Sequence, residues 1–304
     1  MFGGSTFSPD KDVPDLSDKV IIVTGGNIGL GLETVRQLVK HNPARVYLAA
    51  RSKEKADAAI EKLRASNPNA APISFLSLDL ASFESIKAAV QAFQSVESRL
   101  DVLVNNAGIM MSPEGLTKEG YEIQFGTNHL GHALLIHLLL PILQRTAVIN
   151  PEARVVTVSS GLEASAPDDI YQLNELKTTM PKRTATARYA ISKVANIHYT
   201  LALAERYKTV KFIVIHPGVV QSNLRHDVSG VFLRAFMTTA VDFLATPVEK
   251  GVLTQLWAAV SLEAKSGECY RPTAAIWKPS KPSRNHKLQE QLWNWTQEQF
   301  ENQS

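Results

Sequence analysis

A tyrosine and a lysine four residues apart, Tyr189 and Lys193, are the first pair in this sequence whose spacing suggests chemistry. On an α-helix, such residues share one face, about 6 Å apart along the axis. A tyrosine titrates near ~10, so proton exchange at neutral pH needs a shift of about three units, or ~4 kcal/mol. A cation about 4 Å away supplies an interaction of that order. The pair therefore suits general acid–base catalysis. Taken alone, its spacing fits an ordinary amphipathic helix better.

A glycine-rich turn stands between an apolar strand and a helix near the N-terminus. Residues 20–23 are a β-branched run, typical of a strand buried on both faces. The run leads into Thr24-Gly25-Gly26-Asn27-Ile28-Gly29-Leu30-Gly31, after which apolar residues recur at helical spacing. Glycines let a backbone approach a pyrophosphate, and a helix N-terminus supplies unpaired N–H groups. This context favours a phosphate-binding turn over a glycine turn without function.

Strands and helices alternate along the rest of the chain. Strands are predicted at residues 45–50, 73–78, 102–104, 154–159, 212–215 and 269–270, and helices at 53–66, 82–97, within 118–144, around Tyr189 and at 252–260. This alternation predicts an α/β fold with a single Rossmann-type, doubly wound parallel sheet and helices on both faces. Ligands bind beyond the carboxyl ends of the strands in such sheets, and the polar motifs of this chain follow those ends.

Composition excludes several other classes of protein. A chain of 304 residues with 44% hydrophobic and 20% charged residues is globular, and we expect an arm at 1–18 followed by one domain at 19–304. The net charge of +3 is small, and the basic segment 278–287 resembles solvated surface more than a nucleic-acid site. The longest apolar run, 133–143, is too short to span a membrane. The lone Cys269 fits a reducing compartment, so a cytoplasmic location is expected.

Taken in order, the motifs of this chain resemble the short-chain dehydrogenase/reductase family over roughly residues 17–225. The motifs are Thr24-Gly25-x-x-x-Gly29-x-Gly31, Asp79, Asn105-Asn106-Ala107-Gly108, Asn128, Ser159-Ser160, Tyr189-x-x-x-Lys193 and Pro217-Gly218. The glycine spacing is similar to that of the compact, single-domain members. The run Ser192-Lys193-x-Ala195-Asn196, and the 28 residues between Ser160 and Tyr189, resemble the retinol-dehydrogenase-like branch and its fungal relatives.

The resemblance implies four catalytic residues. Tyr189 would be the general acid in carbonyl reduction and the base in alcohol oxidation. Lys193 would hold the nicotinamide ribose and depress the pKa of the tyrosine. Ser160 would hydrogen-bond the substrate oxygen, where charge develops. Asn128 would hold a water behind Lys193 in a proton relay.

The resemblance also implies a set of residues that bind the cofactor. They are Gly25, Asn27, Ile28, Leu30, Arg51, Asp79, Asn105, Tyr189, Lys193, Val220 and Ser222. Enzymes that use NAD place an acid at the end of the second strand, where this chain has Ala50 followed by Arg51. A guanidinium can bind a 2′-phosphate. We therefore expect NADP(H).

The expected function is oxidoreduction between a ketone or aldehyde and an alcohol on a small molecule, in secondary metabolism. Apolar residues within 224–247, which by position form a flap, suggest a fairly bulky apolar substrate, although ordinary packing explains them nearly as well. Two alternatives remain: a cofactor sensor without turnover, and an enzyme recruited to a non-redox cyclisation. We expect no metal site, since the histidines at 129, 132 and 137 lack further ligands. The long helix and the Tyr189 helix either form a homo-oligomer interface or simply face the sheet.

Overall fold

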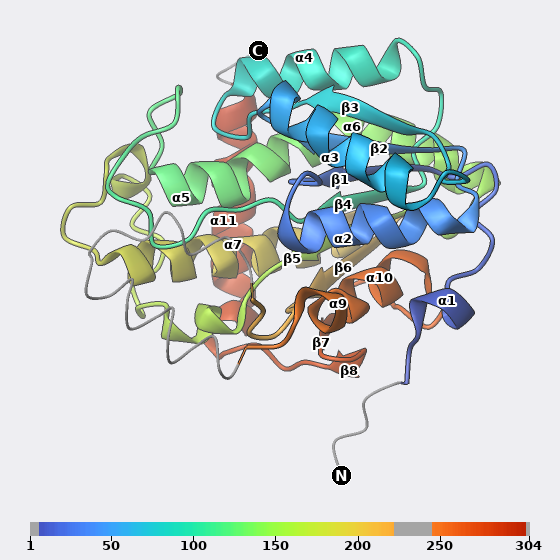
Figure 1. Ribbon diagram of the computed structural model, residues 1–304. Coiled ribbons are helices and arrows are strands. Elements are labelled where there is room, and N and C mark those ends of the chain that lie inside the picture. The colour runs from blue at the N-terminus through green and yellow to red at the C-terminus, as the bar shows by residue number, and fades with distance from the viewer. Residues whose placement is uncertain (1–5, 222–244, 302–304) are drawn as a thin grey trace.

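The computed structural model describes residues 6–221 and 245–301. Its centre is an eight-stranded sheet in the order β3-β2-β1-β4-β5-β6-β7-β8 (Figure 1). The strands are β1 (Val20–Thr24), β2 (Arg45–Ala50), β3 (Ile73–Ser77), β4 (Val102–Asn105), β5 (Arg154–Val158), β6 (Lys211–Ile215), β7 (Cys269–Arg271) and β8 (Ala275–Ile276). Neighbours from β3 to β7 are parallel, and only the β7–β8 pair of this sheet is antiparallel. The predicted doubly wound parallel sheet is confirmed. The two-residue β8 was not predicted.

Helices cover both faces of the sheet (Figure 1). The α-helices are α1 (Pro9–Asp12), α2 (Gly29–Leu38), α3 (Lys53–Ser66), α4 (Phe83–Gln94), α5 (Ile123–Phe125), α6 (Gly131–Ile149), α7 (Ala185–Arg206), α9 (Val248–Gly251), α10 (Leu253–Val260) and α11 (His286–Glu301). A π-helical turn, η2 (Gly126–Leu130), joins α5 to α6, and the 3₁₀ turns are η1 (Val39–His41), η3 (Gly161–Ser165), η4 (Glu175–Lys177) and η6 (Pro282–Arg284).

Each face of the sheet has its own apolar core, because side chains alternate along every strand. Ile22 and Leu103 point to the face covered by α4, α6, α7 and α11. Ile21 and Val104 point to the face covered by α2, α3 and α10. The strands are therefore buried on both sides, as the β-branched runs predict.

The two ends of the chain pack onto this body. Phe7, Val13 and Leu16 of the predicted arm are buried against the α2 and α3 side. At the other end, α11 packs along α7, where Trp293 stacks on Tyr199 with ring centres 5.3 Å apart. The helix α11 therefore covers part of α7. A homo-oligomer interface on α7 stays a prediction, and a partner subunit would have to fit beside α11.

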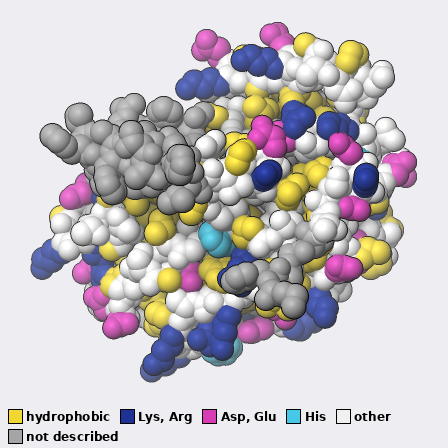
Figure 2. Space-filling model, turned by 60° about the horizontal axis from the view of Figure 1, so that its bottom comes forward, with side chains coloured by type: hydrophobic (Ala, Val, Ile, Leu, Met, Phe, Trp, Pro, Cys, Tyr) yellow, Lys and Arg dark blue, Asp and Glu magenta, His cyan; other side chains and the backbone are white. Residues whose placement is uncertain are grey.

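The long apolar helix and the surface charges bear on the expected absence of membrane and nucleic-acid partners. The stretch Ile123–Ile149 is long and apolar enough to cross a membrane, but 61% of its most apolar window is buried inside the protein. Such burial is typical of a core helix. Figure 2 shows one face of the molecule, on which Lys and Arg side chains are interspersed with Asp and Glu.

Candidate active site

Ser160, Tyr189 and Lys193 come together at the carboxyl end of β5. Ser160 caps η3 directly after the strand, and its hydroxyl oxygen accepts a hydrogen bond from the Leu162 amide at 3.2 Å. The Ser160 hydroxyl lies close enough to the Tyr189 phenol to lower its pKa. The Lys193 ammonium lies 5.5 Å from the centre of the Tyr189 ring and donates to the Val158 carbonyl at 3.1 Å. Three of the four predicted catalytic side chains therefore share one buried neighbourhood.

Burial sets the charge of this pair. It raises the pKa of Tyr189 to about 12, against a smaller lowering by Ser160. It lowers the pKa of Lys193 to about 8. The pKa of the tyrosine is therefore raised, whereas Lys193 was expected to depress it. The physical reason is that desolvation of a buried phenolate outweighs a cation that lies over the ring and donates to a backbone carbonyl.

Asn128 lies in the π-helical turn η2, beside Lys193. Its side chain is fully buried. Oδ1 accepts a hydrogen bond from the Ile109 amide at 2.8 Å, and Nδ2 donates one to the Ile109 carbonyl at 2.9 Å. These two bonds hold the loop after β4 in place. Nδ2 also donates to Ser192 Oγ at 3.0 Å, which ties the turn to α7. A Cβ built on Gly108 would lie 3.2 Å from Asn128 Oδ1 and 3.6 Å from Lys193 Nζ. Asn128 thus joins the predicted group, and π-helical turns are frequent at functional sites.

The glycine turn after β1 has the geometry of a phosphate-binding turn. Gly25 and Gly29 have φ angles of 64° and 55°, which favour glycine. A Cβ built on Gly31 would lie 2.2 Å from the Gly25 carbonyl oxygen, so only glycine lets α2 start this close to the turn. Ile28, which precedes α2, is 47% exposed at the mouth of the turn. The helix N-terminus is thus open to an anion.

His132 on α6 links this turn to Asn128, a connection that sequence reasoning missed. The Thr24 hydroxyl oxygen accepts from the amides of Asn106 and Ala107, each at 2.9 Å, and its proton has two acceptors within reach, the Val104 carbonyl at 3.4 Å and the nearer His132 ring. The hydroxyl oxygen lies 2.9 Å from His132 Nε2, while His132 Nδ1 lies 2.9 Å from the Asn128 carbonyl oxygen. Because a carbonyl only accepts, Nδ1 carries the proton and Nε2 accepts from the threonine. Burial lowers the pKa of His132 to about 4, which keeps the ring neutral.

Asn105 supplies a test of whether these residues fit a dinucleotide. The side chain is 1% exposed, yet neither its Oδ1 nor its Nδ2 has a hydrogen-bond partner among the described residues. The hydroxyl of Thr157, its register partner on β5, is also buried without a partner. Buried polar groups without partners are costly, and ribose hydroxyls or water beside β4 would satisfy them. With the glycine turn, Lys193 and this asparagine, the site fits a nicotinamide dinucleotide.

His216 is a second residue that the sequence analysis left without a role. It directly follows β6, and its Nδ1 accepts from the amide of Gly161 at 3.2 Å and from that of Gly218 at 3.3 Å. The ring thereby connects the turn of Ser160 to the loop of Pro217. Burial, aided by the charge of Arg271, lowers the pKa of His216 to about 4. Its position between a strand and Pro-Gly was the signal in the sequence.

The end of β2 carries the residues expected to choose between cofactors. Ala50 is the buried last residue of β2, and Arg51 is exposed immediately after it. Lys53 pairs with Asp57 at 2.6 Å across the first turn of α3. Asp79, expected at the adenine, accepts from the Ala81 amide at 3.0 Å through Oδ1. This edge therefore presents one exposed guanidinium and no acid at the end of β2.

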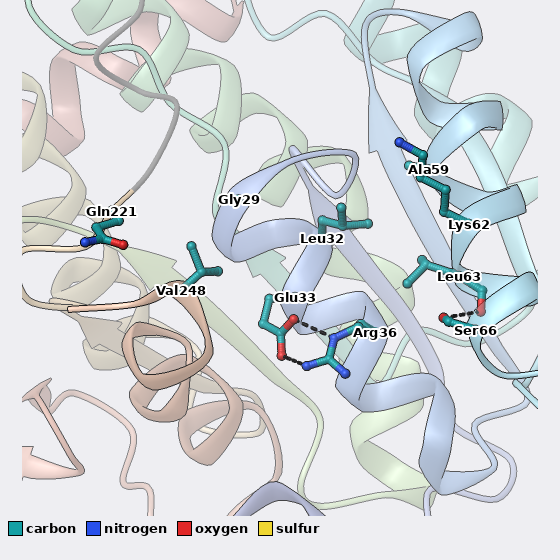
Figure 3. Close-up of a pocket in the computed structure, with 10 residues that line it drawn as sticks. All are labelled: Gly29, Leu32, Glu33, Arg36, Ala59, Lys62, Leu63, Ser66, Gln221 and Val248. Carbon is teal, nitrogen blue, oxygen red and sulfur yellow. Dashed lines mark hydrogen bonds and ion pairs between the residues drawn. The ribbon is translucent and has the colours of Figure 1, made fainter. Parts of the chain in front are cut away.

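The remaining predicted contacts lie beyond β6. Val220 is buried, and a Cβ on Gly251 would come within 2.5 Å of its side chain, so that side chain points toward α9. Ser222 and residues 224–244 of the predicted flap lie outside the described residues. A cavity of about 480 Å³ opens beside the glycine turn, between α2, α3 and Val248 (Figure 3). Its lining includes Gly29 but none of the four predicted catalytic residues, so it is distinct from their site.

The fold and this strand-end site define a nucleotide-binding α/β oxidoreductase. The family model described as short chain dehydrogenase matches residues 19–168. A short-chain dehydrogenase/reductase of Armillaria gallica is 40% identical over 290 residues, which cover 94% of this chain and 91% of that protein. Retinol dehydrogenase 12 of Mus musculus is 34% identical over 298 residues, which cover 97% of this chain and 89% of that protein. The chain therefore belongs to the short-chain dehydrogenase/reductase family, whose members use a nicotinamide cofactor.

Among solved structures, the Pseudomonas aeruginosa RhlG/NADP active-site complex superposes with a TM-score of 0.66 at 25% identity. The alignment covers 86% of this chain and 96% of that one. The likeness extends over most of both chains.

Proposed function

We propose that this protein interconverts a ketone or aldehyde and an alcohol on a fairly bulky apolar molecule, with NADP(H), in secondary metabolism. The observation that carries the proposal is the Lys193 ammonium 5.5 Å from the centre of the Tyr189 ring, with the Ser160 hydroxyl close enough to lower the pKa of the phenol. An acid, a hydrogen-bond donor and a cation at one strand end match the needs of carbonyl reduction.

In the direction of reduction, each side chain has a defined task. NADPH, when bound, supplies a hydride to the carbonyl carbon. Ser160 donates a hydrogen bond to the carbonyl oxygen, and Tyr189 donates a proton to it as negative charge develops there. A pKa of about 12 keeps the phenol protonated at neutral pH, so Tyr189 is ready as an acid. Lys193 would hold the ribose and stabilise the tyrosinate that remains.

The reverse reaction requires the phenolate, and here the environment of Lys193 matters. A pKa near 8 leaves most of the ammonium charged at neutral pH and still allows it to release a proton. The proton that Tyr189 takes from the alcohol would leave through Lys193 and a water held by Asn128, whose side chain fixes the adjoining loop; in reduction the same route would return a proton to Tyr189. This arrangement supports one acid–base route in both directions.

Two features support the choice of substrate and cofactor. Leu162 and Val219, which follow Ser160 and Gly218, are 38% and 56% exposed at the carboxyl edge of the sheet. Exposed apolar side chains at this edge favour an apolar substrate. The absence of an acid at Ala50, with Arg51 exposed beside it, favours NADPH over NADH.

The test is the absorbance of NADPH at 340 nm in the presence of a panel of carbonyl compounds. Decanal, 2-decanone, α-tetralone and 9,10-phenanthrenequinone cover aliphatic and fused-ring shapes, and acetone is the small control. Loss of absorbance with at least one large compound, faster than with acetone, is the expected result. Tight NADPH binding without oxidation by any compound would instead favour the sensor.

A further inference from the structure

Glu163 is a buried carboxylate only three residues after Ser160. It is 2% exposed, and it is the only buried residue of the 3₁₀ turn η3. Its amide donates to the Ser160 carbonyl at 3.1 Å, which closes the turn that begins at the serine. A buried carboxylate is costly unless several donors surround it. The identity of those donors shows what holds this turn in place.

The donors come from the C-terminal extension, more than 110 residues away along the chain. The amide of Ser280 donates to Glu163 Oε1 at 2.8 Å, and the Ser280 hydroxyl donates to Oε2 at 2.5 Å. The hydroxyl of the fully buried Ser283 also donates to Oε2. Both carboxylate oxygens are therefore satisfied by residues of a single short segment.

The same segment is fastened to α7. His198 Nε2 lies 3.0 Å from the Pro282 carbonyl oxygen, and its Nδ1 lies 2.9 Å from the Tyr171 hydroxyl. Since the carbonyl only accepts, His198 donates through Nε2 and accepts through Nδ1. His198 follows Lys193 by five residues on α7. Residues 280–284, called the C-terminal brace below, thus connect the turn of Ser160 with the helix of Tyr189 and Lys193.

We propose that the C-terminal brace sets the position of Ser160 relative to Tyr189, and that Glu163 is the positioning residue through which it acts. This inference rests on the proposed function. Gly161 and Leu162 are exposed, so Glu163 supplies the buried side chain of η3 and adds its anchor to the bond from the Gly161 amide to His216. Because a displacement of about 1 Å can cost about 10²-fold in rate, a buried anchor next to Ser160 has direct catalytic value.

The test compares brace variants with a control in the same extension. Glu163→Gln removes the charge, while Ser280→Ala removes one donor and Ser280→Thr restores a hydroxyl at this half-buried position. The control is Glu290→Gln, which breaks the 2.6 Å pair between α11 and Arg206 without touching η3. The rate is measured with the panel compound that is reduced fastest, together with the Kd for NADPH, the Tm and amide hydrogen exchange of residues 160–166.

The brace predicts a specific pattern. Glu163→Gln is expected to lower kcat by about 10- to 100-fold, with an NADPH Kd within about twofold of the wild type. Ser280→Ala is expected to lower kcat less, and Ser280→Thr to recover it. When Ser160 is already replaced by alanine, adding Glu163→Gln or Ser280→Ala should lower kcat hardly any further, because the side chain being positioned is absent. Exchange in 160–166 should rise in Glu163→Gln and Ser280→Ala only.

Two results would overturn the inference. The first would be that Glu163→Gln and Ser280→Ala both lower the Tm but have the same kcat as the control Glu290→Gln. The other is a loss of rate that is equally large with and without the Ser160 hydroxyl. If the wild type reduces no panel compound, the proposed function fails separately, and the exchange measurement still tests the brace: unchanged exchange in 160–166 refutes it.

Discussion

The Lys193 ammonium lies 5.5 Å from the centre of the Tyr189 ring and donates its hydrogen bond to the Val158 carbonyl rather than to the phenol. The lysine is therefore held by the strand end and lies over the tyrosine ring. Burial acts on both groups and favours the neutral form of each. The tyrosine is a protonated acid until the cofactor and substrate change its surroundings.

Replacing Tyr189 with phenylalanine removes the proton donor and keeps the ring. Turnover is expected to fall by about 10²–10⁴-fold, while the Kd for NADPH stays within about threefold because the ring packing is retained. Stopped-flow oxidation of NADPH and fluorescence titration measure the two quantities. The matched control is Tyr199→Phe on the same helix, whose hydroxyl contacts Gln297 at 3.4 Å, away from the site. Equal rates for the Tyr189 variant and the wild type would disprove the mechanism.

Replacing Lys193 with methionine should abolish activity, weaken NADPH binding and yet stabilise the protein near neutral pH. The pKa of Lys193 is lowered to about 8 from 10.5, so below pH 8 the native protein carries a buried charge. Between pH 8 and 10.5 the native state releases its proton before the unfolded state does, and wild-type stability rises with pH. The shift corresponds to about 3 kcal/mol.

Urea unfolding at pH 7, 9 and 10 checks this second effect. Lys193→Met is expected to require more urea than the wild type at pH 7, and its advantage should shrink as the pH rises. Tyr189 does not interfere, because its raised pKa changes stability only above its ordinary value of 10. A constant difference between the two proteins across this range would show that the lysine is not desolvated as described.

Replacing Gly31 with alanine tests the close approach of α2 to the glycine turn. The new Cβ would lie 2.2 Å from the Gly25 carbonyl oxygen and 2.6 Å from Asn106 Nδ2. A cost of about 1–3 kcal/mol in the free energy of unfolding is expected, with weaker NADPH binding because the turn must shift. Gly115→Ala is the control, since its nearest neighbour would be at 3.6 Å. Similar denaturation curves for the two variants would contradict the proposed packing.

Replacing His216 with leucine leaves the amides of Gly161 and Gly218 without their acceptor. The expected cost is about 1–3 kcal/mol, together with a raised KM for substrate. His216→Asn should recover most of the stability and most of the substrate affinity, because the asparagine side-chain oxygen can accept in place of Nδ1. The pKa of His216 is lowered to about 4, so its contribution is complete above pH 6.5 and is lost between 6.5 and 4. Urea unfolding should therefore show a shallower acid dependence in the asparagine variant than in the wild type.

The sequence predicted most of the fold because its signals are local. The strand Arg45–Ala50 and the helix Lys53–Ser66 were predicted at their observed ends, where Ser52 caps the helix by accepting from the Lys55 amide. The π-helical turn at Gly126–Leu130 was missed, since it lies between α5 and α6 with no proline to interrupt the helical pattern. The predicted catalytic residues do lie together, as expected for motifs that follow parallel strand ends.

The parts that sequence reasoning missed depend on contacts between distant residues. Glu163 and Ser280 are separated by 117 positions, and nothing in either local sequence indicates their hydrogen bond. The ring tautomer of His132 follows only from the geometry of Thr24 and Asn128. The raised pKa of Tyr189 likewise depends on burial, which the spacing of Tyr189 and Lys193 does not reveal.

Cofactor preference gives the last prediction, because Ala50 ends β2 where an acid would select NAD. Ala50→Asp is expected to raise the KM for NADPH strongly and to improve the use of NADH, since a carboxylate repels a 2′-phosphate and accepts from ribose hydroxyls. Arg51→Ala should weaken NADPH by about fivefold or more, because the exposed guanidinium is removed. Lys53→Ala is the control, as that ammonium is paired with Asp57 at 2.6 Å. Comparison of kcat/KM for both reduced cofactors measures the change, and a wild type that prefers NADH would refute the assignment.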